Sequence, residues 1–297
     1  MKTYLDCIPC FFRQLLDAAR IANVKAKKQK QIIDEFAKKI PKISLEASPP
    51  EIARVAYKLL KKLSSNDDPY KAIKQKSNRS ALNHFRELKN KVNYSKDRLL
   101  AALKLAIAGN IIDFGVNPVR KSLNVDNELK RILKEKNKSI RKNSIFHYRE
   151  FLGTLKTAKN ILYLADNAGE VVFDRILIEE IKRIYPDKNI YYVVKAKPII
   201  NDALFVDANV CGINNIAQII SNGIDAPGTI LSLCSKNFKK IYKRVDMIIS
   251  KGQGNFESLD ERKKPVFFLF MVKCPVVSRE TGCKIGDRVL LSNLVIS

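Results

Sequence analysis

The sequence predicts an α/β protein in which a mostly parallel sheet is flanked by helices, with an all-helical N-terminal part. Two observations predict this fold class. In the first 110 residues, apolar residues recur three and four apart, which is typical of amphipathic helices. From about residue 158, short β-rich runs end in Gly, Asn or Asp and are followed by helical stretches, an alternation typical of a parallel sheet. We therefore expect a helical domain over 1–118 and an α/β domain over 119–297.

Each expected element follows from its own pattern. The N-terminal part carries helical spacing at 10–22, 27–39, 51–63 and 97–108, with breaks at "PKIS", "SPP" and "SSNDDPY". The basic stretch 120–143 is expected to form a helix that links the two parts. Short β-rich runs predict strands at 161–165, 190–194, 246–250, 266–270 and, less strongly marked, 288–292, with a helix over 170–184 after the first strand.

Composition limits where the protein acts. No run of about 18 or more uncharged apolar residues is present, so the sequence predicts no membrane-spanning segment. The apolar part of the N-terminus is flanked by Asp6 and Arg13, which does not fit a secretory signal. We therefore expect a cytoplasmic protein.

The net charge of +25 raises nucleic acid as a partner. The lysines are spread along the chain, however, and no zinc finger or aromatic ribonucleoprotein strand accompanies them. The charge also predicts a positive potential that attracts phosphorylated or carboxylated metabolites. The alternative is a basic nucleic-acid-binding protein without catalytic activity. This alternative predicts nucleic-acid binding that weakens steeply with salt and does not change when a chelator is added. Of the two kinds of partner, we favour a small metabolite over nucleic acid.

Six cysteines are too few for a secreted disulfide framework in a chain of this length. Only Cys7 and Cys10 are closely spaced, and such a pair could be a redox motif, half of a zinc site or two packed thiols on a helix. No second C-x-x-C follows, and His84 and His147 show no ligand spacing to the pair. We favour packed thiols.

Polar side chains follow the predicted strands. Asp166 and Asn167 come after the first strand, Asp202 lies in "KAKPIINDA" after the second, and "SNGIDAPGT" and "KGQGNFES" follow later. Ligands bind beyond the carboxyl ends of strands in open parallel sheets, so these groups are expected at one edge. Two carboxylates and an amide offer hard oxygen donors, which suit magnesium or manganese and are acceptable to cobalt or nickel. Three protein oxygens leave positions for water and substrate.

The stretch "KGQGN" supplies a complementary anion site. Gly252 and Gly254 let the backbone approach an anion closely, and Lys251 adds a positive charge, with Asn255 next to them. The stretch is neither a P-loop nor a dinucleotide fingerprint. The alternative is an ordinary turn that needs a positive φ.

Three other stretches allow a structural and a functional interpretation. Asn167 and Glu170 fit a capping box at the start of a helix. Asn110 and Asp113 sit in the apolar "AIAGNIIDFG" and either bond to local backbone or form a lid or substrate wall. In "NDDPYKAIK" at 66–74, we favour a helix cap by one of the two aspartates over a cleft edge.

The chain resembles the metal-dependent damage-control phosphatases, long listed as a domain of unknown function and sometimes linked to acidic-residue methyltransferases. The matching stretches run in order from residue 7 to 277: "CIPCFFRQLLDAAR", "NDDPYKAIKQKSN", "LAIAGNIIDFG", "LADNAGEVVFDRILIEEI", "KAKPIINDAL", "DAPGT", "SKGQGNFESL" and "KCPVV". The C-x-x-C start is similar to the prokaryotic branch. No glycine-rich adenosylmethionine loop follows the first strand, so the methyltransferase link finds no support.

The resemblance implies hydrolysis of small phosphorylated, sugar-phosphate-like metabolites with a divalent cation, in metabolite damage control. It places Asp166 and Asn167 on the family's metal-binding pair, Asp202 on its third ligand and Lys251 on its phosphate-contacting lysine. The segment 203–210, "ALFVDANV", is less acidic than the resemblance leads us to expect, since it implies frequent Thr and Glu there.

The expected mechanism follows from these assignments. The metal, held by Asp166, Asn167 and Asp202, binds a phosphoryl oxygen, while Lys251 and the backbone N–H groups of 252–255 neutralise the others. A metal-bound water would attack in line, and an aspartyl-phosphate at Asp166 is the alternative. The remaining residues expected around the substrate are Gly252, Gly254, Asn255, Glu170, Asn110 and Asp113.

Overall fold

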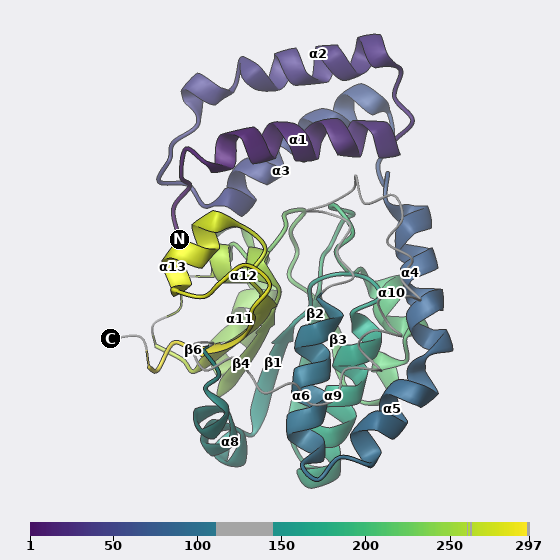
Figure 1. Cartoon of the computed structure of the whole chain (residues 1–297), viewed down its shortest axis with the longest axis vertical. Helices are drawn as coiled ribbons and strands as arrows, with labels where there is room; N and C mark the ends of the chain where they lie inside the picture. Colours follow the sequence, from purple (N-terminus) through teal and green to yellow (C-terminus); the bar gives the residue numbers. More distant parts are fainter. Residues whose placement is uncertain (111–144, 260, 262, 296–297) are drawn as a thin grey trace.

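The structure, a computed structural model, describes residues 1–110, 145–259, 261 and 263–295 (Figure 1). Three N-terminal helices form a layer at one end of the molecule, and a sheet covered by helices forms the rest. The expected linking helix at 120–143, the expected boundary at 118 and Asp113 lie outside the described residues.

The first three helices pack around a core of their own. They are α1 (Cys7–Ile21), α2 (Ala26–Ala37) and α3 (Pro49–Ser64), joined by the 3₁₀ turn η1 (Ile40–Lys42). Their shared interior contains Leu15, Phe36 and Leu60, all fully buried. A capping box starts α3, in which the Glu51 carboxylate accepts the Ser48 backbone N–H at 2.8 Å. These helices confirm the first three expected from apolar spacing.

Three further helices join this layer to the sheet: α4 (Lys71–Asn83), α5 (Phe85–Asn93) and α6 (Arg98–Gly109). Only α6 was predicted. The spacing rule misses α4 because its buried positions include the polar residues Lys74, Ser77 and Asn78. The predicted aspartate cap is wrong, because α4 begins after Tyr70 without a side-chain cap and Asp68 instead pairs with Lys74 at 2.8 Å.

Six strands form a single sheet in the order β3-β2-β1-β4-β5-β6. Their bounds are β1 (Asn160–Leu164), β2 (Asn189–Val194), β3 (Gln218–Ser221), β4 (Met247–Lys251), β5 (Val266–Met271) and β6 (Arg288–Ser292). The first five pair in parallel, and β6 runs antiparallel to β5. The predicted α/β fold is therefore confirmed. The sequence-based reading missed β3, which has four half-buried or exposed residues and so lacks a strong apolar pattern.

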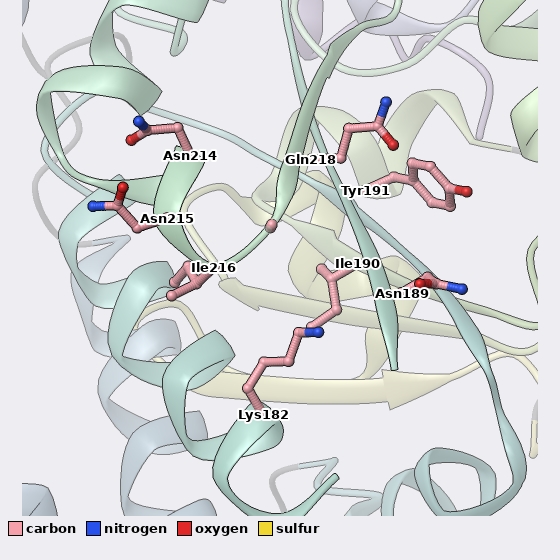
Figure 2. Close-up of a pocket in the computed structure, with 9 residues that line it drawn as sticks. Lys182, Asn189, Ile190, Tyr191, Asn214, Asn215, Ile216 and Gln218 are labelled. Carbon is pink, nitrogen blue, oxygen red and sulfur yellow. The ribbon is translucent and has the colours of Figure 1, made fainter. Parts of the chain in front are cut away.

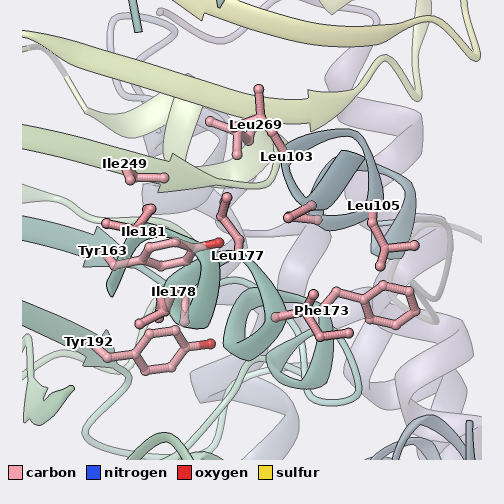
Figure 3. Close-up of a cluster of buried hydrophobic side chains, with 14 of the residues drawn as sticks. Leu103, Leu105, Tyr163, Phe173, Leu177, Ile178, Ile181, Tyr192, Ile249 and Leu269 are labelled. Atoms are coloured by element: carbon pink, nitrogen blue, oxygen red, sulfur yellow. The ribbon is translucent and has the colours of Figure 1, made fainter. Parts of the chain in front are cut away.

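Helices cover both faces of the sheet. One face carries α6, α8 (Tyr148–Thr157) and α9 (Val171–Ile184), and the other carries α11 (Lys236–Arg244) and α13 (Pro275–Thr281). Short elements fill the connections: α10 (Phe205–Val210), α12 (Gln253–Ser258), η2 (Ile213–Asn215) and η3 (Leu231–Leu233). Side chains alternate between the faces, with Tyr163 in the α9 core and Leu164 in the opposite core. Figure 3 shows the α9 side of this interior.

The strand order places a topological switch between β1 and β4. From β1 the chain moves outward to β2 and β3, and it then returns to β4 on the other side of β1. The connections after β1 and β4 therefore diverge and leave room for a ligand at the carboxyl ends of these two strands. Within the described part of the chain, no helix is long and apolar enough to cross a membrane.

We expect Leu177→Ala to lower the free energy of unfolding by about 2–5 kcal/mol, because this fully buried side chain fills the interface between α9 and the sheet. Ile184→Ala is the matched control, since Ile184 ends the same helix with 39% of its surface exposed. Urea unfolding of both variants tests the packing. Equal losses in the two variants would contradict the described position of α9.

Candidate functional site

The turn after β4 lies directly against the carboxylate that follows β1. Gly252 adopts φ +81°, and a Cβ on this residue would lie 2.0 Å from Asp166 Oδ2. Glycine is therefore required both for the backbone conformation and for the close approach. The predicted neighbours Asp166 and Gly252 are brought together at the switch point.

Two asparagine amides hold the carboxylate of Asp166. The side-chain nitrogens of Asn110 and Asn167 donate to Asp166 Oδ2 at 2.8 and 3.0 Å, and both donate to Glu170 Oε1 at 2.8 Å. Both asparagines and Glu170 are buried, whereas Asp166 is partly exposed. Asn110, at the end of α6, therefore reaches into the site with its side chain instead of bonding to local backbone.

Of the two interpretations of Asn167 and Glu170, the structure excludes the capping box at the start of α9. The helix begins at Val171, and Glu170 precedes it without a side-chain cap. Its carboxylate accepts hydrogen bonds from the Asn167 amide and from Lys251 Nζ, so it faces the site and not the backbone of the first turn. Electrostatic pairing inside the protein competes with capping here and replaces it.

Lys251 lies beneath this layer, fully buried. Its Nζ donates to Glu170 Oε2 at 3.0 Å and to Asp174 Oδ1 at 2.7 Å. The hydroxyl groups of Tyr163 and Tyr192 donate to Asp174 at 2.7 and 2.8 Å. Burial alone would lower the pKa of Lys251, but the two carboxylates outweigh it and hold the pKa above its ordinary value. A phosphate contact by Lys251 would require it to exchange one of these carboxylates.

Sequence reasoning missed Asp174. The available signal was a carboxylate on the apolar side of the predicted helix 170–184, one turn after Glu170. A charged residue on a buried helix face needs a partner of opposite charge. In this site that partner is Lys251.

Asp202 is placed beside Asp166 by backbone pairing. Asn167 and Asp202 form an antiparallel bridge, and the backbone N–H of Ala203 donates to the carbonyl of Asp166 at 2.8 Å. Ile200, two residues before Asp202, adopts φ +43°, a strained conformation for a β-branched side chain. The structure therefore brings together the three predicted metal ligands, Asp166, Asn167 and Asp202.

Asn255 holds two strand ends to α12. Its side-chain nitrogen donates to the carbonyl oxygens of Lys251 and Ala165 at 2.7 and 3.2 Å, and its oxygen accepts the Thr229 hydroxyl at 2.8 Å. Both amide hydrogens are thereby used within the protein. The predicted contacts of Asn255 and Gly254 with phosphate stay predictions.

The donor set suits a hard divalent cation. Asp166 reaches the surface. Asn167 turns its amide nitrogen to the carboxylates of Asp166 and Glu170, and the side-chain oxygen of Asn167 accepts no hydrogen bond from the described residues. No three His, Cys, Asp or Glu side chains in the described ranges are arranged to hold a metal by themselves. A cation here would therefore depend on two carboxylates, one amide oxygen and its own waters, which magnesium and manganese accept.

Two other features of the sequence have contacts outside this network. Asp225, in the loop after β3, accepts from Arg54 Nε at 2.6 Å and so ties that loop to α3. Cys7 and Cys10 start α1, and burial raises the pKa of both thiols. Raised pKa values reduce the thiolate fraction, which favours the packed-thiol interpretation over a reactive pair.

A surface hollow of about 590 Å³ lies at the opposite end of the sheet. It is lined by Lys182 of α9, by the first residues of β2 and by the segment 214–218 that leads into β3 (Figure 2). These are the amino ends of the strands, so the hollow is separate from the carboxyl-edge cluster.

Comparison with known proteins gives consistent matches over nearly the whole chain. The family of the damage-control phosphatase ARMT1-like domain matches residues 3–289. An uncharacterized protein of Methanocaldococcus jannaschii is 38% identical over 98% of this chain and 95% of the relative. Damage-control phosphatases of Pyrococcus horikoshii and Archaeoglobus fulgidus are 35% and 30% identical, over 99% and 97% of this chain and 99% and 98% of the relatives.

A solved structure shares the fold. The crystal structure of a DUF89 family protein from Pyrococcus horikoshii superposes with a TM-score of 0.83 at 33% identity and covers 99% of both chains.

We expect Gly252→Ala to displace Asp166 and to abolish divalent-cation binding, because its Cβ would overlap the carboxylate. Gly286→Ala is the matched control: Gly286 has φ +89°, and nothing lies within 4 Å of its added Cβ. The control should lose about 1–3 kcal/mol of stability from backbone strain and keep its cation affinity. Calorimetric titration with Mn²⁺ separates the two variants. Equal Mn²⁺ affinities would contradict the close contact with Asp166.

Proposed function

Because the chain belongs to the damage-control phosphatase ARMT1-like domain family, we propose that it hydrolyses small phosphorylated metabolites with a divalent cation. The observation that carries the proposal is the Asp166–Asn167 pair at the switch point, with Asp202 bridged beside it. Sugar phosphates are the proposed substrate class, and the cytoplasm is the proposed location.

The proposed cation is magnesium, manganese, cobalt or nickel, held by Asp166, Asn167 and Asp202. All three offer oxygen, and no histidine takes part, which disfavours a histidine-rich zinc site. When bound, the cation supplies positive charge to the phosphoryl group and thereby favours attack by water. Oxygen from water then ends on phosphate, and the leaving alcohol takes up a proton.

The chain's own residues prepare the site for this charge. The amides of Asn110 and Asn167 both donate to Asp166 Oδ2 and so hold this partly exposed carboxylate in one orientation at the strand end. Lys251 offsets part of the negative charge of Glu170 and Asp174 and so weakens their repulsion of a phosphate from below. We propose that this preorganisation lowers the cost of placing a phosphoryl group next to four carboxylates.

A nucleic-acid-binding function is the second class raised by the +25 charge. No feature of the described residues favours it, and the matching family is named for phosphatases.

We expect chelator treatment to remove phosphate release from a panel of sugar phosphates and other small phosphoesters. Re-addition of magnesium, manganese, cobalt or nickel should restore it, since the donor set accepts hard divalent ions. Colorimetric phosphate release from each substrate with each metal ranks substrates and metals together. Activity that is indifferent to chelator, or tight salt-sensitive RNA binding without hydrolysis, would contradict the proposal.

We expect Asp166→Ala to reduce turnover at least about 100-fold, because a preorganised charge at the reacting group is lost. Mn²⁺ affinity should fall at least about tenfold, since loss of a residue that only supports a metal ligand already costs that much. Asp187→Ala is the control, since Asp187 is an exposed aspartate between α9 and β2. Steady-state kinetics and calorimetry give the two readouts, and a fully active Asp166→Ala protein would exclude this site.

A further inference from the structure

Lys195 is a buried cation that the proposed mechanism has not used. It follows β2 directly, its side chain is 3% exposed, and its Nζ lies 3.6 Å from Asp202 Oδ2. The backbone N–H of Lys195 donates to the carbonyl of Ala203 at 3.0 Å, while the N–H of Ala203 donates to the carbonyl of Asp166. One extended segment therefore connects the end of β2 to the end of β1 and sets Lys195 next to a proposed metal ligand.

The second partner of Lys195 belongs to the loop after β3. Its Nζ donates to the carbonyl oxygen of Gly228. Gly228 adopts φ +76°, and a Cβ on it would lie 2.3 Å from the carbonyl oxygen of Gly254 in α12. The ammonium group thus lies between the Asp202 carboxylate and the two touching backbone turns that follow β3 and β4.

Lys195 differs from the other buried lysines of the described residues. Lys251 is neutralised by two carboxylates, and Lys74 pairs with a carboxylate that precedes α4. Lys188 contacts main-chain carbonyls at the amino end of the sheet. Among the carboxylates that pair with these buried lysines, only Asp202, the partner of Lys195, is also a proposed metal ligand.

We propose that Lys195 is a catalytic residue that contacts the substrate phosphate beside Asp202, an inference that rests on the proposed function. A divalent cation that shares the Asp202 carboxylate would face the Lys195 ammonium, and two like charges at this range repel. A phosphate dianion next to both neutralises them. Lys195 therefore makes phosphate binding stronger when the cation is present, and it makes cation binding weaker when phosphate is absent.

The test compares Lys195→Met, Lys195→Arg and Lys197→Met with the natural protein. Methionine keeps the length of the side chain without its charge, arginine keeps the charge, and Lys197 is an exposed lysine in the same loop. Calorimetry measures Mn²⁺ binding, and then inorganic phosphate binding to the Mn²⁺-loaded protein. Melting temperature, kcat and KM for the best phosphoester are measured in parallel.

In Lys195→Met, we expect phosphate affinity to fall roughly 10- to 100-fold, as loss of one charge-assisted hydrogen bond predicts. Mn²⁺ affinity in the absence of phosphate should rise, because the repelling ammonium group is gone. Lys195→Arg should retain most phosphate affinity, and Lys197→Met should behave like the natural protein.

Two outcomes would overturn the inference alone: phosphate affinity in Lys195→Met within about twofold of the natural protein, or joint loss of phosphate affinity, Mn²⁺ affinity and melting temperature in both Lys195 variants. The second outcome would show that Lys195 only supports the Gly228 loop. If the natural Mn²⁺-loaded protein neither binds phosphate nor releases it from any phosphoester, the proposed function fails, and the inference fails with it.

Discussion

The pairing of Lys251 with Glu170 and Asp174 is the interaction on which the site depends. All three side chains are fully buried, and such charges are tolerated in an interior only when each finds an opposite charge and hydrogen bonds. These contacts join Lys251, the last residue of β4, to Asp174 in the first turn of α9 and to Glu170 just before it. The hydroxyl groups of Tyr163 and Tyr192 also donate to Asp174. Removal of Lys251 would leave two carboxylates facing each other beneath the surface.

This arrangement divides the acidic residues into two layers. The lower layer, Glu170 and Asp174, is paired with the buried Lys251 and fixes the geometry of the site. The upper layer, Asp166 and Asp202, lies at the strand ends where a ligand can approach. The amides of Asn110 and Asn167 connect the layers, since each donates to Asp166 and to Glu170. A single hydrogen-bonded network therefore positions Asp166 and Asn167, and Lys251 offsets part of its negative charge.

Much of the fold could be predicted because it depends on local patterns. Apolar runs gave five of the strands, and helical spacing gave α1, α2, α3, α6 and α9. The helix α4 and the strand β3 could not be found in this way, because polar residues occupy buried positions of α4 and β3 is only partly buried. The rule that ligands gather at carboxyl strand ends placed Asp166, Asn167 and Asp202 together correctly.

Which polar groups face each other could not be predicted, since that depends on tertiary packing. A capping box explains Asn167 and Glu170 equally well in the sequence, and only the position of Lys251 decides between the two arrangements. Asp174 was missed for the same reason: its partner is 77 residues away in the chain. Lys251 itself looks like a free cation in the sequence, whereas both of its carboxylates come from α9 or the residue before it.

The order in which the ribosome delivers these residues has a consequence for folding. A nascent chain that ends after β2 already contains Asp166, Glu170 and Asp174, but it lacks the Lys251 that pairs with the last two. Until β4 emerges, α9 would have to bury two uncompensated carboxylates against the sheet, which is costly. Stable docking of α9 should therefore wait for the C-terminal third of the chain, so the sheet and its acidic centre form together late in synthesis.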